Sequence, residues 1–333
     1  MNSAFEATIA AKQVTVREVG LREGLQSDTK VLATADKVEL FRGVVEAGCR
    51  EINAISLVNP KRMPQMADAE AFLAAARELR GDIVVSALVP NLRGLERALE
   101  LRKLDLLDTA LLVFMDSEQA LAANGMTAGR DELLQQIAVS TARSVDAGMN
   151  VSVFISLAFG SSLDGWVDPA SVVRAAEDIQ AIPGVSEIIV SDSVGHADPL
   201  QVYRMLRDLA NVLPTDQRLA LHLHDTRGAG LANVIGALNS PFENLVFDAA
   251  FGGWGGDFPF IPEALGNLAS EDLVEMLLGM GFDLGVDVDA LIGLARRYAE
   301  LSGRAIESEV PTCGPIRWKR EHRPAAGELA GVR

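Results

Sequence analysis

The sequence predicts an α/β fold of the (β/α)8, or TIM-barrel, type with a helical appendage at its C-terminal end. The first observation is that short apolar segments, typical of buried strands, alternate about eight times with helical segments at near-regular spacing. The second is that no Gly-x-Gly-x-x-Gly motif follows the first strand, which disfavours a doubly wound open sheet. We assign residues 1–282 to the barrel and 283–333 to a C-terminal helix and tail that pack on it.

Each expected strand is a short apolar run that ends at polar or glycine residues. In chain order these runs are Val14–Val19, Glu51–Ser56, Ile83–Val89, Leu107–Met115, Val151–Leu157, Glu187–Val190, Leu219–Leu223 and Leu245–Ala250. Residues 1–13 are expected to form a short polar arm that precedes the first strand.

Each strand is followed by a segment with apolar residues at helical spacing. In the first, Val38 and Phe41 lie on one side of the expected helix and Gly48 ends it. The expected barrel helices are Ala35–Ala47, Asp68–Leu79, Leu92–Leu101, about Arg130–Ala147, Pro169–Ala181, about Pro199–Val212, Gly230–Leu238 and a segment from Gly266 onward. Val288–Leu301 is expected as the appended helix, and about the last dozen residues as a disordered tail.

Composition excludes several classes of function. Thirty basic against 46 acidic residues give a net charge of −16, which argues against nucleic acid or an anionic membrane as the main partner. No apolar run approaches the roughly 18 residues that span a bilayer, and the first residues do not resemble a secretory signal. Cys49 and Cys313 are too few and too far apart for a disulfide framework, so we expect a cytoplasmic protein.

The stretch Leu221–Gly228 contains a pair of histidines with the spacing of metal ligands. His222 and His224 are two residues apart on or at the end of an expected strand, so their side chains point the same way. Two imidazoles on one side of a strand end make half of a metal site. The alternative is two core histidines satisfied by hydrogen bonds.

Other polar residues follow the expected strands at the same end of the barrel, where active sites of this fold lie. Glu23 with the two histidines gives an oxygen–nitrogen–nitrogen set, with Asn267 at the start of the last barrel helix as a fourth ligand. This set suits Mg²⁺, Mn²⁺ or Zn²⁺ and leaves positions open for a chelating substrate. Arg22 would supply a fixed cation for a carbonyl or enolate oxygen, or else pair with Glu23.

Four motifs resemble hydroxymethylglutaryl-CoA lyase and, more broadly, the metal-dependent lyase and Claisen-synthase barrels. They are the segments 19–26 (VGLREGLQ), 58–66 (VNPKRMPQM), 222–226 (HLHDT) and 266–273 (GNLASEDL). The resemblance runs from about Val14 to Cys313, in the family order, and is therefore specific. It implies that Glu23, His222, His224 and Asn267 hold a divalent metal.

The resemblance also implies roles for other residues and shows departures from the family. Arg22 maps to the family's enolate-stabilising Arg, while Gln26 and Asp192 match a family Gln and Asp. Glu23 stands where the family usually has Asp. The residues that replace family side chains expected to face the substrate are Asn53 for Glu, Phe154 for Tyr and Arg227 for Tyr.

The largest departure is the loop after the eighth strand, residues 252–260 (GGWGGDFPF), which lacks the family's catalytic cysteine. Its glycines indicate either a mobile lid or a tight turn with positive φ. Asp257 is the nearest candidate for the acid that protonates the enolate, with water an equal alternative. Asp192, or a metal-bound hydroxide, is the candidate base.

These observations predict a metal-dependent carbon–carbon lyase that acts on a 3-hydroxyacyl-CoA. Arg227 could bind a substrate carboxylate or be a surface turn residue. One alternative is a 2-oxo acid aldolase or a Claisen condensing enzyme on the same metal site. A second, from another class, is a catalytically silent binding barrel. The family resemblance implies a homo-oligomer, a dimer or larger.

Overall fold

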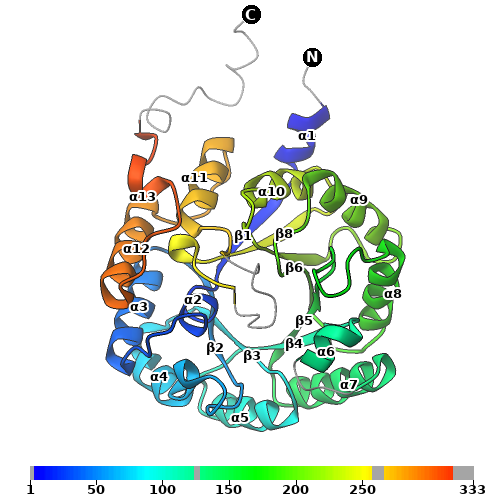
Figure 1. The fold of residues 1–333 in the computed structure, drawn as a ribbon, viewed down its shortest axis with the longest axis horizontal. Coiled ribbons are helices and arrows are strands. Elements are labelled where there is room, and N and C mark those ends of the chain that lie inside the picture. The colour runs from blue at the N-terminus through cyan, green and yellow to red at the C-terminus, as the bar shows by residue number, and fades with distance from the viewer. Residues whose placement is uncertain (1–3, 124–127, 257–265, 318–333) are drawn as a thin grey trace, which may run out of the picture.

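Eight parallel strands pair in sequence order in the computed structural model and close into a barrel, because β1 pairs with both β2 and β8 (Figure 1). The structure describes residues 4–123, 128–256 and 266–317. The strands are β1 Gln13–Glu18, β2 Glu51–Ser56, β3 Val84–Leu88, β4 Thr109–Met115, β5 Asn150–Ser156, β6 Glu187–Asp192, β7 Arg218–Leu223 and β8 Asn244–Ala249. The predicted (β/α)8 barrel is confirmed.

Helices surround the barrel as an outer ring (Figure 1). Those between or after the strands are α2 Glu23–Gln26, α3 Thr34–Glu46, α4 Ala69–Ala76, α5 Leu92–Lys103, α6 Glu118–Ala123, α7 Arg130–Asp146, α8 Pro169–Gln180, α9 Pro199–Leu209, α10 Gly230–Leu238 and α11 Ser270–Met280. Short 3₁₀ turns lie at Pro64–Met66, Arg77–Leu79 and Phe251–Gly253 (η1–η3), and the C-terminal region adds α12 Val288–Ser302 and α13 Val310–Cys313.

The sequence prediction does not include α1, α2, α6 or α13, of which α1 and α6 have a simple physical reason. The residues before the first strand form α1, Ala4–Ala10, instead of a polar arm. This helix is too short for its apolar spacing to be read from the sequence, although its Ala-rich composition favours helix. The second is α6, where the Ser117 hydroxyl accepts a hydrogen bond from the Ala120 amide and so caps a helix of less than two turns.

Strand alternation divides the apolar residues into two layers. One set of side chains packs between the strands and the helices, and a second cluster fills the barrel interior, with Leu111, Phe154, Ile189, Ala220 and Val246. The interior also holds buried charged residues, which are described below. Among the described residues, no helix is long and apolar enough to cross a membrane.

The C-terminal helix α12 packs against α3 and against the turn after β8. Gly48, just after α3, has a φ of +91°, and a Cβ there would lie 2.2 Å from the Gly285 carbonyl oxygen. The Asp287 amide, just before α12, donates a hydrogen bond to the Ala47 carbonyl. This close backbone approach attaches the C-terminal region to the barrel.

We predict opposite effects for two glycine substitutions, one at this attachment and one at an open position of α12. Gly48→Ala should lower the free energy of unfolding by at least about 1–2 kcal/mol, because the backbone is left-handed and the added methyl overlaps a carbonyl. Gly293→Ala, within α12 and with open space around the new Cβ, should raise it by about 0.5–1 kcal/mol. Urea denaturation would measure both, and equal midpoints would contradict the close approach.

Candidate metal centre

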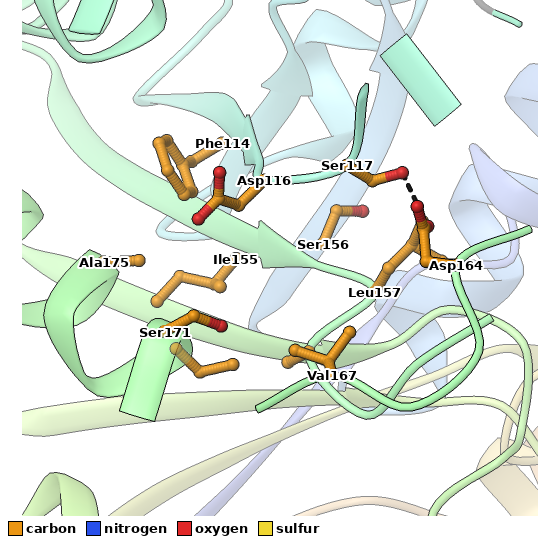
Figure 2. Close-up of a pocket in the computed structure, with 12 residues that line it drawn as sticks. Phe114, Asp116, Ser117, Ile155, Ser156, Leu157, Asp164, Val167, Ser171 and Ala175 are labelled. Atoms are coloured by element: carbon orange, nitrogen blue, oxygen red, sulfur yellow. Dashed lines mark hydrogen bonds between the residues drawn. The ribbon is translucent and has the colours of Figure 1, made fainter. Parts of the chain in front are cut away.

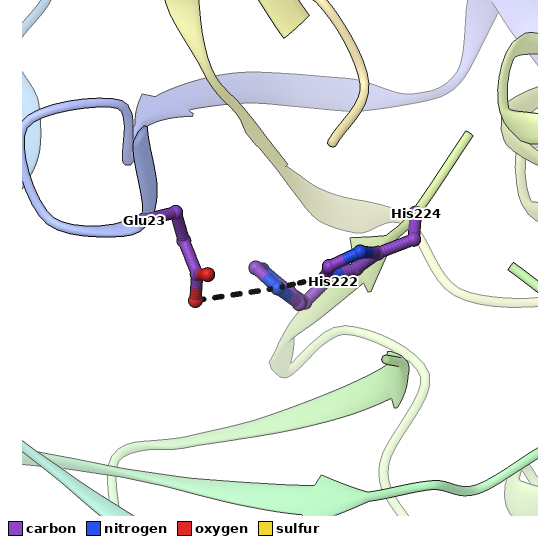
Figure 3. A group of neighbouring side chains, drawn as sticks. All are labelled: Glu23, His222 and His224. Atoms are coloured by element: carbon purple, nitrogen blue, oxygen red, sulfur yellow. Dashed lines mark hydrogen bonds and ion pairs between the residues drawn. The ribbon is translucent and has the colours of Figure 1, made fainter. Parts of the chain in front are cut away.

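Glu23, His222 and His224 lie together, buried, at the end of the barrel where the strands finish, which we call the barrel mouth (Figure 3). One ligand atom from each residue lies within 4.8 Å of the others. The two Nε2 atoms of the histidines are 3.2 Å apart, and Glu23 Oε1 is 3.7 Å from His222 Nε2. Two ligands at right angles on a cation, each at about 2.1 Å, would be about 3 Å apart.

The local fold explains this convergence. His222 lies near the end of β7 and His224 one residue beyond it, where the backbone forms an antiparallel bridge with Asn267. Glu23 begins α2, a single turn of helix that follows β1. Because all eight strands are parallel, both chain segments emerge at the same mouth.

Asn267 lies beside His224, one of the three grouped residues. The sequence predicted that Asn267 begins the last barrel helix, and this prediction is wrong. Helix α11 begins at Ser270, and Asn267 sits in the bridge to His224. Its amide nitrogen donates to the Trp254 carbonyl at 3.2 Å, which leaves its oxygen for another partner. A Cβ on Gly255 would lie 1.8 Å from that amide nitrogen, so residue 255 has no room for a side chain.

The donor atoms of this group fit a divalent cation. Within the described residues, Glu23 Oε2 and Asn267 Oδ1 are buried and have no hydrogen-bond partner. Burial, together with the nearby His222 and Arg22, lowers the pKa of His224 well below its ordinary value, so its imidazole is neutral. Two imidazoles with carboxylate and amide oxygens are a ligand set for Mg²⁺, Mn²⁺ or Zn²⁺.

Arg22 contacts both the ligand group and β2. Its guanidinium pairs with Glu23, and its Nε donates to Asn53 Oδ1 at 2.6 Å. The Asn53 amide nitrogen in turn donates to the Ser86 carbonyl at 3.1 Å, which fixes which end of the amide faces Arg22. The pairing of Arg22 with Glu23, considered as an alternative, therefore coexists with the approach of Glu23 to the histidines.

The other expected site residues lie at varied positions. The Phe154 ring lies nearly perpendicular to the His222 ring, with ring centroids 5.5 Å apart, and Gln26 is buried at the end of α2. Arg227 is exposed, and its Nη1 donates to the carbonyls of Val194 and Gly195, which ties together the turns after β6 and β7. Asp257 lies outside the described residues.

Asp192 ends β6, and its side chain is bound to its own loop. One carboxyl oxygen accepts the His196 amide and the other accepts the Ala197 amide, both at 2.9 Å. Burial raises the pKa of Asp192 above its ordinary value. Each oxygen retains a second lone pair, so the group can still accept a proton.

A small cavity opens beside this end of the barrel, between β4, β5 and α8 (Figure 2). Asp116, Ser117, Ser156 and Asp164 are among the polar residues that line it. The Ser117 hydroxyl donates to Asp164 at 2.6 Å, which joins the loops that follow β4 and β5. None of the four candidate metal ligands lines this cavity.

Sequence reasoning missed the aromatic packing that holds the loop after β8. Gly252, Gly253 and Gly256 have φ of +71°, +73° and +87°, so the described part of the loop is a tight turn with positive φ. Trp254 is fully buried and packs on Tyr298 of α12, with ring centroids 4.5 Å apart. The Tyr298 hydroxyl donates to Asp28, just beyond α2, at 2.6 Å.

Two buried carboxyl groups hold the same loop by its backbone. Glu18 accepts the Phe251 amide at 3.1 Å, and Glu271 accepts the Gly252 amide at 3.0 Å. Burial raises the pKa of each group to about 7. Glu18 lies at the end of β1 and Glu271 in the first turn of α11, so the loop is fixed from both sides.

Comparison with known proteins assigns this architecture to a family. Residues 13–297 match the HMGL-like family. The chain belongs to the HMGL-like family. It is 36% identical over 314 residues to the (R)-citramalyl-CoA lyase of Chloroflexus aurantiacus, covering 91% of this chain and 95% of that protein. It is 34% identical over 297 residues to a hydroxymethylglutaryl-CoA lyase of Bacillus subtilis, covering 89% and 96%.

A solved structure agrees with this HMGL-like assignment. The structure of an HMG-CoA lyase from Acinetobacter baumannii, in complex with coenzyme A and 3-methylmalate, matches with a TM-score of 0.83 at 30% identity. The match covers 95% of this chain and 98% of that one. These relatives confirm the predicted family and the prediction of an enzyme of the carbon–carbon lyase class.

Glu271→Gln should change how stability depends on pH. The folded-state pKa is raised from 4.5 to about 7, so the folded protein binds this proton more tightly than the unfolded chain does. The stabilisation is therefore complete below about pH 4.5 and lost as the pH rises to about 7. As the pH rises across this range, the free energy of unfolding of Glu271→Gln should increase relative to that of the wild type by roughly 2–3 kcal/mol. Parallel stability curves for the two proteins would contradict the raised pKa.

Proposed function

We propose that this HMGL-like protein is a divalent-metal-dependent lyase that cleaves a carbon–carbon bond of a 3-hydroxyacyl-CoA, giving an acyl-CoA enolate and a keto product. The observation that carries the proposal is the buried group of Glu23, His222 and His224 at the barrel mouth. Asn267 is the proposed fourth ligand. Mg²⁺ or Mn²⁺ is the proposed cation, with Zn²⁺ as the alternative; when bound it would act as a Lewis acid toward the substrate oxygens.

Arg22 has the position and charge to stabilise the enolate. It is buried next to Glu23, and its guanidinium cannot lose its proton at neutral pH. Asn53, which is neutral, accepts a hydrogen bond from Arg22 Nε and so orients the guanidinium without adding a second negative charge beside it. A fixed cation at a water-excluded site favours the charge that develops on the thioester oxygen as the bond breaks.

Proton transfer needs a base and an acid. The proposed base is Asp192, whose raised pKa brings it closer to the range in which a carboxylate accepts a proton efficiently. It would take the proton of the substrate's 3-hydroxyl while the electron pair of the broken bond passes to the enolate. Asp257 or water would then protonate that enolate. We propose that Asp257 or water takes the place of the family's cysteine in this step, since residues 252–260 contain no cysteine.

The proposed substrate is citramalyl-CoA or a longer branched analogue of hydroxymethylglutaryl-CoA. Phe154 presents an apolar ring next to His222, which favours an apolar substituent near the cation. Arg227 is the proposed contact for a substrate carboxylate, Gln26 a further substrate contact. We expect the protein to act in the cytoplasm as a dimer or larger homo-oligomer.

A retro-Claisen assay tests the proposal. Metal-reconstituted protein is incubated with a panel of 3-hydroxyacyl-CoAs that includes citramalyl-CoA and hydroxymethylglutaryl-CoA, and acetyl-CoA release is measured. We expect release from one panel member, with a loss of at least about 100-fold in His222→Ala and Glu23→Ala, because each removes a ligand. Glu39→Gln, an exposed carboxylate paired with Arg297, is the matched control and should keep full activity.

The other outcomes would distinguish the alternatives. If the protein binds metal but releases acetyl-CoA from no panel member, the acyl-CoA proposal is wrong, and a 2-oxo acid aldol substrate on the same site is favoured. Absence of both metal binding and turnover would favour the silent binding barrel.

A further inference from the structure

Asp248, which lies outside the ligand set named above, contacts one of the candidate ligands directly. It lies on β8, opposite His222 in the β7–β8 register and opposite Arg17 in the β1–β8 register. The side chains of Asp248, His222 and Arg17 all face the barrel interior. Asp248 Oδ2 is 3.0 Å from His222 Nδ1, and its Oδ1 accepts a hydrogen bond from Arg17 Nε at 2.6 Å.

The chemistry of this contact defines the protonation of both partners. The buried Arg17 guanidinium donates its Nε–H to Asp248 Oδ1 at 2.6 Å and stabilises a negative charge there, so Asp248 is a carboxylate. A carboxylate can only accept hydrogen bonds, so the proton of a neutral His222 must lie on Nδ1. The Nε2 lone pair is then exposed on the side of the ring that faces His224 and Glu23.

The charges behind Asp248 also favour a cation at His222. Arg17 pairs with Glu187 as well, at 2.6 Å, and Glu187 pairs in turn with Arg218, which contacts Glu51. Two guanidinium groups therefore face three carboxylates, an excess of one negative charge. Arg17, Glu187 and Asp248 are the buried members of this network, one guanidinium against two carboxylates, and the low polarity around them strengthens the effect of their charge.

We propose that Asp248, held as a carboxylate by Arg17, is a positioning residue that fixes the tautomer and orientation of His222 and so sets the affinity of the site for its divalent cation. The proposal builds on the metal site proposed above. His224 differs, because its Nδ1 has no hydrogen-bond partner among the described residues. Its orientation depends instead on the backbone bridge to Asn267, so the two histidines are fixed by different means.

Asp248→Asn is the informative substitution because it keeps the shape and reverses the hydrogen bond. Arg17 Nε will hold the amide oxygen, which turns the amide N–H toward His222 Nδ1. That nitrogen must then accept, and the ring proton moves to Nε2, where it occupies the lone pair that the cation needs. Loss of such an outer partner typically lowers metal affinity 10–100-fold.

The test combines two measurements. Calorimetric titration with Mn²⁺ should show affinity 10–100-fold weaker in Asp248→Asn than in the wild type. Nitrogen NMR of histidine-labelled, metal-free protein should place the His222 proton on Nδ1 in the wild type and on Nε2 in the variant. The wild-type spectrum gives a result even if the variant folds poorly.

Glu187→Gln is the matched control, since it removes a carboxylate from the other side of Arg17 at similar burial without contacting His222. It should change stability and leave the His222 proton on Nδ1, and it should lower the Mn²⁺ affinity by less than Asp248→Asn does, because it removes a charge but no contact of His222. A wild-type proton on Nε2, unchanged affinity in Asp248→Asn, or equal losses in both variants would overturn the proposal. Failure of the wild type to bind Mn²⁺ while its His222 proton lies on Nδ1 would overturn the metal site and the role in affinity, and leave the tautomer assignment standing.

Discussion

The pairing of β8 with β1 on one side and β7 on the other is the constraint on which the candidate site depends. This pairing closes the barrel, and the same registers place Asp248 between Arg17 and His222. It also brings the segment after β1, which carries Glu23, and the segment after β7 to one mouth. A slip of one residue in either register would turn Asp248 to the outer layer and leave Arg17 buried without its partner. The buried charges therefore specify the register as much as the apolar core does.

The loop after β8 is a second constraint, because it connects the ligand group to the C-terminal helix. The backbone of Trp254 accepts a hydrogen bond from Asn267, while its ring packs on Tyr298. Gly24, next to Glu23, faces the Trp254 side chain, and a Cβ there would lie 3.6 Å from it. One tryptophan is thus in contact with the neighbours of two candidate ligands. The appended helix α12 supports the mouth of the barrel and is not merely attached to its outside.

Most of the fold could be predicted from the sequence because strand alternation and helical spacing are local signals. The expected strands agree with the observed ones to within two residues at either end. The pairing of His222 with His224 and the approach of Glu23 follow from side-chain direction on parallel strands. The contact with Asp248 could not be read in this way, because it depends on which residues of β7 and β8 lie opposite each other. A single Asp in an apolar strand gives no indication of its partner.

Asp192, the proposed base, makes contacts that its motif does not reveal. The sequence places it after a strand at the mouth, where a catalytic base would lie, and the structure places both its oxygens on the backbone amides of its own loop. Asp248 is the reverse case, a carboxylate inside the barrel whose partner is a ligand side chain. A carboxylate that binds backbone amides fixes the path of a loop, whereas one that binds an imidazole fixes where a proton lies. The two aspartates therefore act on the same mouth by different means: Asp192 fixes the loop that borders it, beside its proposed role as base, and Asp248 fixes the tautomer of His222.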